Sequence, residues 1–169
     1  MLKLSKLQLS NYQLSKYACA LALALTSIQV PAAARKIENF DGRTWPRMQK
    51  ELPRPAAVIF STTDCGHCPA IIAAMAEQIK NHKPQIPLIV VVMDGDGQAD
   101  LLQEPHYQAA SRLFVFKGQT AALQYGINPS WRGITPYVAL LPKAGAVKLV
   151  LGKPSEQELD NWLAARTKP

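Results

Sequence analysis

Residues 60–75 read Phe60-Ser-Thr-Thr-Asp-Cys65-Gly-His-Cys68-Pro-Ala-Ile-Ile-Ala-Ala-Met75, and the rest of the chain is organised around this stretch. Two residues separate its two cysteines, an apolar run begins four residues before it, and a helix-like pattern ends it. If Cys65 opens a helix, Cys68 lies one turn later, so the two sulfur atoms can form a disulfide with modest strain. The spacing therefore predicts a dithiol pair where a strand passes into a helix.

This position favours redox chemistry. A helix N-terminus carries unpaired N–H groups and a partial positive charge, which stabilise a thiolate and lower the pKa of its thiol. We therefore expect Cys65 to attack and Cys68 to resolve the mixed disulfide. His67 adds positive charge when protonated, whereas Asp64 places a negative charge beside Cys65 and opposes thiolate formation. Asp64, Gly66 and His67 are accordingly predicted to tune the pair.

The same cysteine spacing also occurs in zinc, iron–sulfur and copper sites. A structural zinc site usually needs a second ligand pair, and this chain has no second pair of that spacing. The third cysteine, Cys19, lies near the N-terminus, and His82 and His106 have no metal-like spacing with His67. We therefore predict no metal and no other cofactor. Two alternatives stay open: a copper carrier that uses the same two cysteines, and an interaction domain with a static disulfide.

The first 34 residues have the pattern of a secretory signal. Lysines precede an apolar run at residues 17–25, and small residues precede a predicted cleavage between Ala34 and Arg35. Polar residues and a proline follow directly at residues 26–31, so the apolar stretch is too short and too interrupted to predict a membrane span. The alternative is an uncleaved membrane anchor. We therefore expect export to the bacterial periplasm, where disulfides are permitted.

Length and charge limit the classes of function. A chain of 169 residues with 48% hydrophobic content accommodates one domain. We divide it into the signal (1–34), a lead-in (35–54) and the main domain (55–169). Residues 35–169 hold 16 basic and 12 acidic residues. They are scattered, without the interleaved aromatics of a nucleic-acid surface, so no nucleic-acid partner is expected.

The pattern of apolar runs predicts an α/β fold. Apolar runs at residues 56–60 and 88–93 predict buried central strands. Helices are predicted over residues 45–52, 65–81, 101–112 and 120–125, and after residue 155. A proline-led strand at residues 134–141 and a second at 146–151 predict an antiparallel hairpin. Ser155 and Glu158 predict a capping box. Alternating strands and helices predict a partly parallel sheet.

Over about residues 55–165, this order of elements resembles the thioredoxin-fold superfamily. The residues that carry this resemblance are Phe60, Cys65-Gly-His-Cys68, Gly133-Ile-Thr-Pro136 and Gly152. With them the chain is most similar to exported TlpA/DsbE-type thiol–disulfide oxidoreductases. The motif is also that of protein disulfide isomerase domains. The resemblance implies a thioredoxin-like fold with a central mixed sheet flanked by helices. It also implies disulfide exchange with client proteins, in a direction that sequence does not set, and a membrane electron donor or acceptor.

The resemblance also assigns a client-binding loop. Pro136 would be a cis-proline that faces the dithiol, and Thr135 would offer its backbone to the client. The chain departs from thioredoxins in three places: Asp64 replaces a tryptophan, Ile59 replaces a buried acid, and residues 128–132 lengthen the link to the proline. The buried acid assists proton transfer from the resolving cysteine, so its replacement argues against fast reductase turnover. The longer link is expected to shape partner choice.

Overall fold

The computed structural model describes residue 34 and residues 36–164. The predicted signal segment, Cys19 included, therefore lies outside the described residues except for Ala34. The Ala34 N–H donates to the Ala110 carbonyl at 2.8 Å, so the residue before the predicted cleavage is hydrogen-bonded to the domain. Among the helices of the described residues, none has the length and apolar character needed to cross a membrane.

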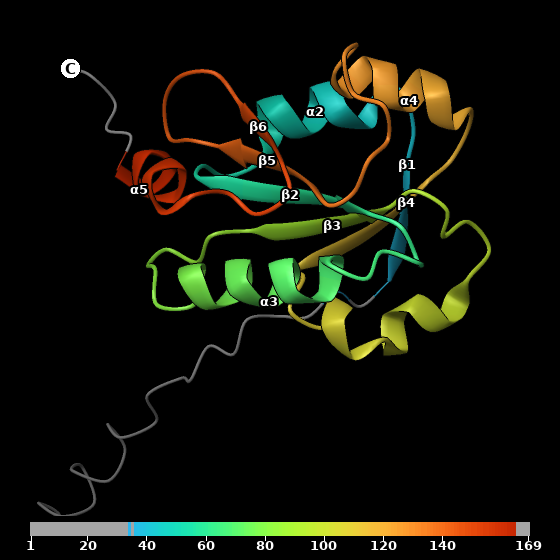
Figure 1. The fold of residues 1–169 in the computed structure, drawn as a ribbon, viewed down its shortest axis with the longest axis horizontal. Coiled ribbons are helices and arrows are strands. Elements are labelled where there is room, and N and C mark those ends of the chain that lie inside the picture. Colours follow the sequence, from blue (N-terminus) through green and yellow to red (C-terminus); the bar gives the residue numbers. More distant parts are fainter. Residues whose placement is uncertain (1–33, 35, 165–169) are drawn as a thin grey trace, which may run out of the picture. The chain divides into compact units, whose positions relative to one another are not determined.

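Six strands form one mixed sheet (Figure 1). Across the sheet they follow the order β1 (Ile37–Phe40), β4 (Arg112–Phe116), β3 (Leu88–Val92), β2 (Ala56–Ser61), β5 (Tyr137–Leu141) and β6 (Lys148–Leu151). Strands β1, β4, β3 and β2 are parallel to one another, whereas β5 pairs antiparallel with both β2 and β6. The carboxyl ends of β2 and β3 therefore meet at one edge of the sheet, together with the start of β5.

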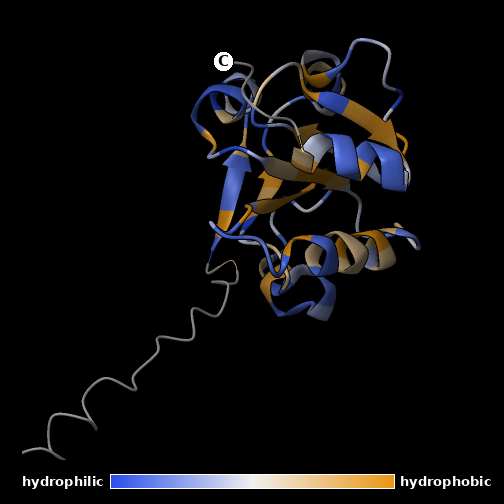
Figure 2. Ribbon diagram, turned by 90° about the vertical axis from the view of Figure 1, so that its left-hand side faces the viewer, coloured by the Kyte–Doolittle hydropathy of each residue, from blue (hydrophilic) through white to orange (hydrophobic). Residues whose placement is uncertain are grey.

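Helices cover both faces of this sheet (Figure 1). The α-helices are α2 (Thr44–Glu51), α3 (Cys68–Ile79), α4 (Thr120–Ile127) and α5 (Glu156–Ala164), and two 3₁₀ helices are η2 (Ala99–Gln103) and η3 (Pro105–Tyr107). Buried side chains of α2 and α4 pack on one face, and those of α3, α5, η2 and η3 pack on the other. The central strands are apolar because both of their faces are covered, as the hydropathy colouring in Figure 2 shows.

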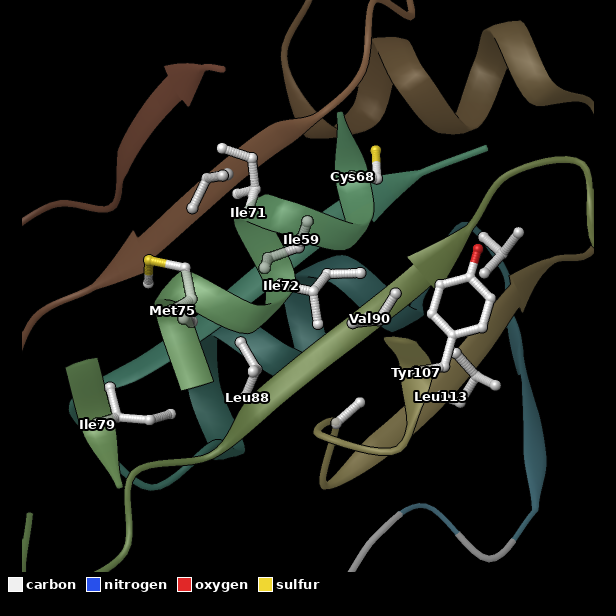
Figure 3. Close-up of a cluster of buried hydrophobic side chains, with 14 of the residues drawn as sticks. Ile59, Cys68, Ile71, Ile72, Met75, Ile79, Leu88, Val90, Tyr107 and Leu113 are labelled. Atoms are coloured by element: carbon white, nitrogen blue, oxygen red, sulfur yellow. The ribbon is translucent and has the colours of Figure 1, made fainter. Parts of the chain in front are cut away.

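Alternation along β2 divides the core into two clusters. Ala57 and Ile59 join the cluster beneath α3, which Figure 3 shows with Ile72 and Cys68. Phe60 belongs to the aromatic cluster beneath α2 and α4. The dithiol helix is thus seated on the sheet by the apolar stripe that its sequence predicts.

The predicted α/β fold with a thioredoxin-like order of elements is confirmed. Strand, dithiol, helix, parallel strand, antiparallel hairpin and final helix follow each other as expected. The capping box is also present, because the Glu158 N–H donates to the Ser155 hydroxyl and the Glu158 carboxylate accepts from the Ser155 N–H.

Two expected helices were wrong, and one strand was not predicted. The helix expected over residues 65–81 begins only at Cys68 and ends at Ile79. The helix expected over residues 101–112 is replaced by η2 and η3, which meet at Glu104 because Pro105 interrupts the pattern. The lead-in holds a strand, β1, that the sequence analysis did not predict.

Strand β1 is pinned to β4 by an ion pair that should respond to pH. Arg112 donates to both carboxylate oxygens of Glu38 at 2.7 Å. This hydrogen bond, with the added positive charge of Arg112, lowers the pKa of Glu38 although partial burial opposes the shift. Because the pKa is lower in the folded chain, the stabilisation is complete above about pH 4.5 and is lost as the pH falls through the folded-state pKa.

Glu38→Gln is therefore expected to destabilise the protein at pH 7 by at most about 1 kcal/mol, as is typical of part-exposed pairs. Below about pH 4.5 the difference from wild type should shrink, because Glu38 of the wild type is itself being protonated. Urea unfolding between pH 3 and pH 7 measures both effects. Glu77→Gln, which removes an exposed pair with Lys80 on α3, is the control. An equal pH dependence in the two variants would contradict the role of Glu38.

Candidate active site

The structure joins Cys65 and Cys68 in a disulfide, with their Cα atoms 5.4 Å apart. Residues 65–67 form a turn before α3: the Cys65 N–H donates to the Thr62 carbonyl at 3.2 Å and the Cys68 N–H to the Cys65 carbonyl at 3.1 Å. Cys65 therefore precedes the helix instead of opening it. Cys68 is 1% exposed, whereas Cys65 is partly exposed. Cys65 is therefore the more accessible residue of the pair.

The three predicted tuning residues surround this disulfide in sequence and lie in solvent. Asp64, Gly66 and His67 are all exposed. Water and salt screen exposed charges strongly, which weakens the influence of Asp64 and His67 on a nearby thiolate. Their tuning role stays a prediction.

A carboxylate from the neighbouring strand braces the loop that leads to Cys65. Asp94, just past β3, accepts hydrogen bonds from the Thr63 N–H at 2.9 Å and from the Thr63 hydroxyl at 2.7 Å. The sequence analysis did not identify Asp94 as part of the site. The signal that could have identified it is its place at the carboxyl end of β3, because the carboxyl ends of adjacent parallel strands lie side by side.

A second loop lies beside the dithiol loop. The Thr62 and Thr135 hydroxyl oxygens are 3.3 Å apart, and pairing of Phe60 with Tyr137 brings β2 and β5 together just below. The peptide bond between Thr135 and Pro136 is cis. The structure therefore brings Thr135 and Pro136 next to the cysteine loop, as the resemblance implies, while their part in client binding stays a prediction.

The longer link before the proline folds inward. The Trp131 ring stacks on Tyr137 with centroids 4.5 Å apart, and it lies 5.3 Å from the Phe60 ring. Its indole N–H donates to the Ile134 carbonyl at 2.9 Å, and the Asn128 side-chain amide donates to the Tyr137 hydroxyl at 2.6 Å. These contacts fix the backbone directly before Thr135. Trp131 therefore positions this loop, a role that the sequence analysis did not identify.

Gly133 lets the same loop pass close to α4. Its φ of +78° lies in the left-handed region, and an added Cβ would come within 2.6 Å of the Gln124 side-chain nitrogen. A larger residue at this position would have to shift both the loop and Gln124. The absence of a side chain at Gly133 therefore allows the loop to lie close to α4.

Comparisons with known proteins add the following. The chain matches no protein-family model and no curated protein. Among solved structures, a thioredoxin-related protein from Neisseria meningitidis serogroup B shares 22% identity, with a TM-score of 0.47 over 67% of this chain and 85% of that one. MTB DsbF, in its mixed oxidised and reduced forms, shares 19% identity, with a TM-score of 0.46 over 66% and 79%. At these values neither structure identifies the activity of this chain.

Proposed function

We propose that the chain is an exported thiol–disulfide oxidoreductase of the TlpA/DsbE type that exchanges disulfides with client proteins. The observation that carries this proposal is the Cys65–Cys68 disulfide at the start of α3, with its first cysteine partly exposed and its second buried. The nearby Thr135–Pro136 loop supports it, because a client must be held against an attacking sulfur. No metal or other cofactor enters this chemistry.

In the reducing direction, the Cys65 thiolate attacks one sulfur of a client disulfide. A Cys65–client disulfide forms, the client disulfide breaks, and the released client sulfur takes up a proton from solvent. The Cys68 thiol then loses its proton and attacks the Cys65 sulfur, which restores the Cys65–Cys68 disulfide and releases the second client thiolate. Two electrons pass from the pair to the client. Isomerisation uses the same first step, and the client then resolves its own mixed disulfide.

The proposal also assigns the client-binding residues, the electron partner and the location of the protein. Thr135 and Pro136 hold the client backbone beside Cys65, while Asp64, Gly66 and His67 tune the pair. A membrane dithiol or disulfide protein supplies or withdraws two electrons after each cycle. The signal segment at residues 1–34 directs the chain to the periplasm and is cleaved near Ala34, or else anchors it to the membrane.

Trapping of clients tests this function. In a bacterial host that expresses the tagged full chain, Cys68→Ala leaves Cys65 without a resolving partner, so mixed disulfides should accumulate. Non-reducing electrophoresis and mass spectrometry detect them as adducts that disappear with dithiothreitol. The double variant Cys65→Ser/Cys68→Ala is the matched control and should give none. An absence of adducts on Cys68→Ala would contradict the proposal, and stoichiometric Cu(I) binding in its place would favour the copper carrier.

A further inference from the structure

The turn that leads into Cys65 gains little from burial. The Cys65 N–H donates to the Thr62 carbonyl at 3.2 Å, which makes Thr63 and Asp64 the two central residues of a β-turn. Both central residues are exposed, so apolar packing does little to hold them. What fixes the turn must therefore be sought in the polar contacts of these residues.

Thr63 is bound by the carboxylate of Asp94. The Thr63 N–H donates to both carboxylate oxygens, at 2.9 and 3.2 Å, and the Thr63 hydroxyl donates to one of them at 2.7 Å. Hydrogen bonds to a carboxylate are about twice as strong as those between neutral groups. The Met93 N–H donates to the Ser61 carbonyl at 2.9 Å, so the pairing of β2 and β3 continues up to the residue before Asp94. The two loops therefore leave the sheet side by side.

Asp94 is the fixed partner in this contact. The next residue, Gly95, is buried, and an added Cβ there would come within 2.6 Å of the Leu101 side chain and 2.9 Å of the Val115 side chain. The Asp94 carbonyl also accepts a hydrogen bond from the Gln98 side-chain amide at 3.2 Å. Because the chain around Asp94 is packed this closely against the core, its carboxylate restrains the exposed turn.

We propose that Asp94 is a positioning residue that acts through Thr63 to stabilise the Cys65–Cys68 disulfide over the dithiol. The inference rests on the proposed function, since it assigns how the redox pair is poised. In the oxidised protein the bond between the two sulfurs also restrains the turn. In the dithiol that bond is absent, and the contact with Asp94 limits the freedom of the turn. Its removal therefore gives more conformational entropy to the dithiol than to the disulfide, so the disulfide becomes easier to reduce.

The negative charge of Asp94 acts in the same direction. A nearby carboxylate disfavours a thiolate, and thiolates form only in the reduced pair. Loss of the charge therefore stabilises the reduced pair further. Because Asp94 is exposed, water and salt screen this effect. A change at Asp94 should thus shift the equilibrium more than a change at Thr63, which removes a hydrogen bond but no charge.

The test is the equilibrium with glutathione, in which two glutathione thiols reduce the Cys65–Cys68 disulfide to the dithiol and become oxidised glutathione. It uses protein purified from cells that express the full chain. Thr63→Val removes the hydroxyl donor and should make the disulfide about twofold to fivefold easier to reduce, the lower part of the range for one net hydrogen bond. Thr63→Ser keeps the hydroxyl and should match wild type. Asp94→Ala removes both acceptor oxygens and the charge, and should give about fivefold to twentyfold.

Asp96→Ala is the matched control. Asp96 is also exposed and lies two residues after Asp94, but its carboxylate pairs with Lys117 at 2.8 Å. The substitution changes the net charge as Asp94→Ala does, and it should leave the glutathione equilibrium unaltered. Equal shifts in the two alanine variants would overturn the positioning role, because charge alone would then explain both.

The remaining outcomes separate this inference from the proposed function. Unchanged or lower reducibility in both Asp94→Ala and Thr63→Val, with a pair that cycles, would overturn this inference alone. A wild-type pair that does not equilibrate with glutathione would overturn it together with the proposed function.

Discussion

Replacing Cys65 with serine is expected to lower the rate of disulfide reduction by roughly a thousandfold or more, the scale of loss when a nucleophile is removed. A serine hydroxyl is not ionised at neutral pH and cannot form a mixed disulfide, so the first exchange step has no attacking group. Cys68 cannot take over readily, because it is 1% exposed. The rate of insulin reduction with dithiothreitol as electron source measures the effect.

Cys19→Ser is the matched control for this substitution, because Cys19 lies in the predicted signal segment. It should leave insulin reduction unchanged in the purified protein. Full activity in Cys65→Ser combined with loss in Cys68→Ser would show that the roles of the two cysteines are reversed. Wild-type activity in both Cys65→Ser and Cys68→Ser would show that the pair does not carry the reaction.

Trp131→Ala is expected to destabilise the fold by about 3–5 kcal/mol, as large aromatic truncations in a core do. The indole is 8% exposed and packs on Phe60 and Tyr137, and its N–H supports the Ile134 carbonyl. Its loss should also release the backbone before Thr135. Denaturant unfolding gives the first effect, and faster amide hydrogen exchange in residues 128–135 gives the second.

Trp131→Phe separates packing from hydrogen bonding in the same site. Phenylalanine keeps an aromatic ring against Tyr137 but removes the donor to Ile134. The missing hydrogen bond should lower the free energy of unfolding by about 1 kcal/mol, and the smaller ring should lower it further. If the alanine and phenylalanine variants unfold at the same denaturant concentration, the stacked rings do not support the loop. The proposed part of Trp131 in the site would then be withdrawn.

The strand–dithiol–helix unit could be predicted because its signals are local. An apolar run marks β2, the cysteine spacing marks the pair, and the stripe of Ile72, Met75 and Ile79 marks the buried face of α3. The hairpin and the final helix were predicted for the same reason, since a glycine-containing turn and a capping box lie within a few residues. The start of α3 was misplaced by three residues, because spacing alone does not distinguish a preceding turn from the first helical turn.

The missed features depend on contacts between distant parts of the chain. Strand β1 is only four residues long, and it is held by β4 and by the Glu38–Arg112 pair. Asp94 reaches the dithiol loop only because β3 is folded beside β2, so that the ends of the two strands lie together. No periodicity in the sequence encodes contacts between such distant residues. The place of Asp94 directly after an apolar strand could nevertheless have indicated its contact with the dithiol loop.

The pairing of β1 has a consequence for the order of folding. Its partner β4 lies between β1 and β3, and Ile37 meets Leu113, which is synthesised more than seventy residues later. The first strand to leave the ribosome therefore cannot enter the sheet until β4 has been made, and closing so long a loop is entropically unfavourable. Strands β2 and β3 can pair well before that, so the unit that carries the cysteines can form while the N-terminal strand is still unpaired. A high contact order of this kind slows folding.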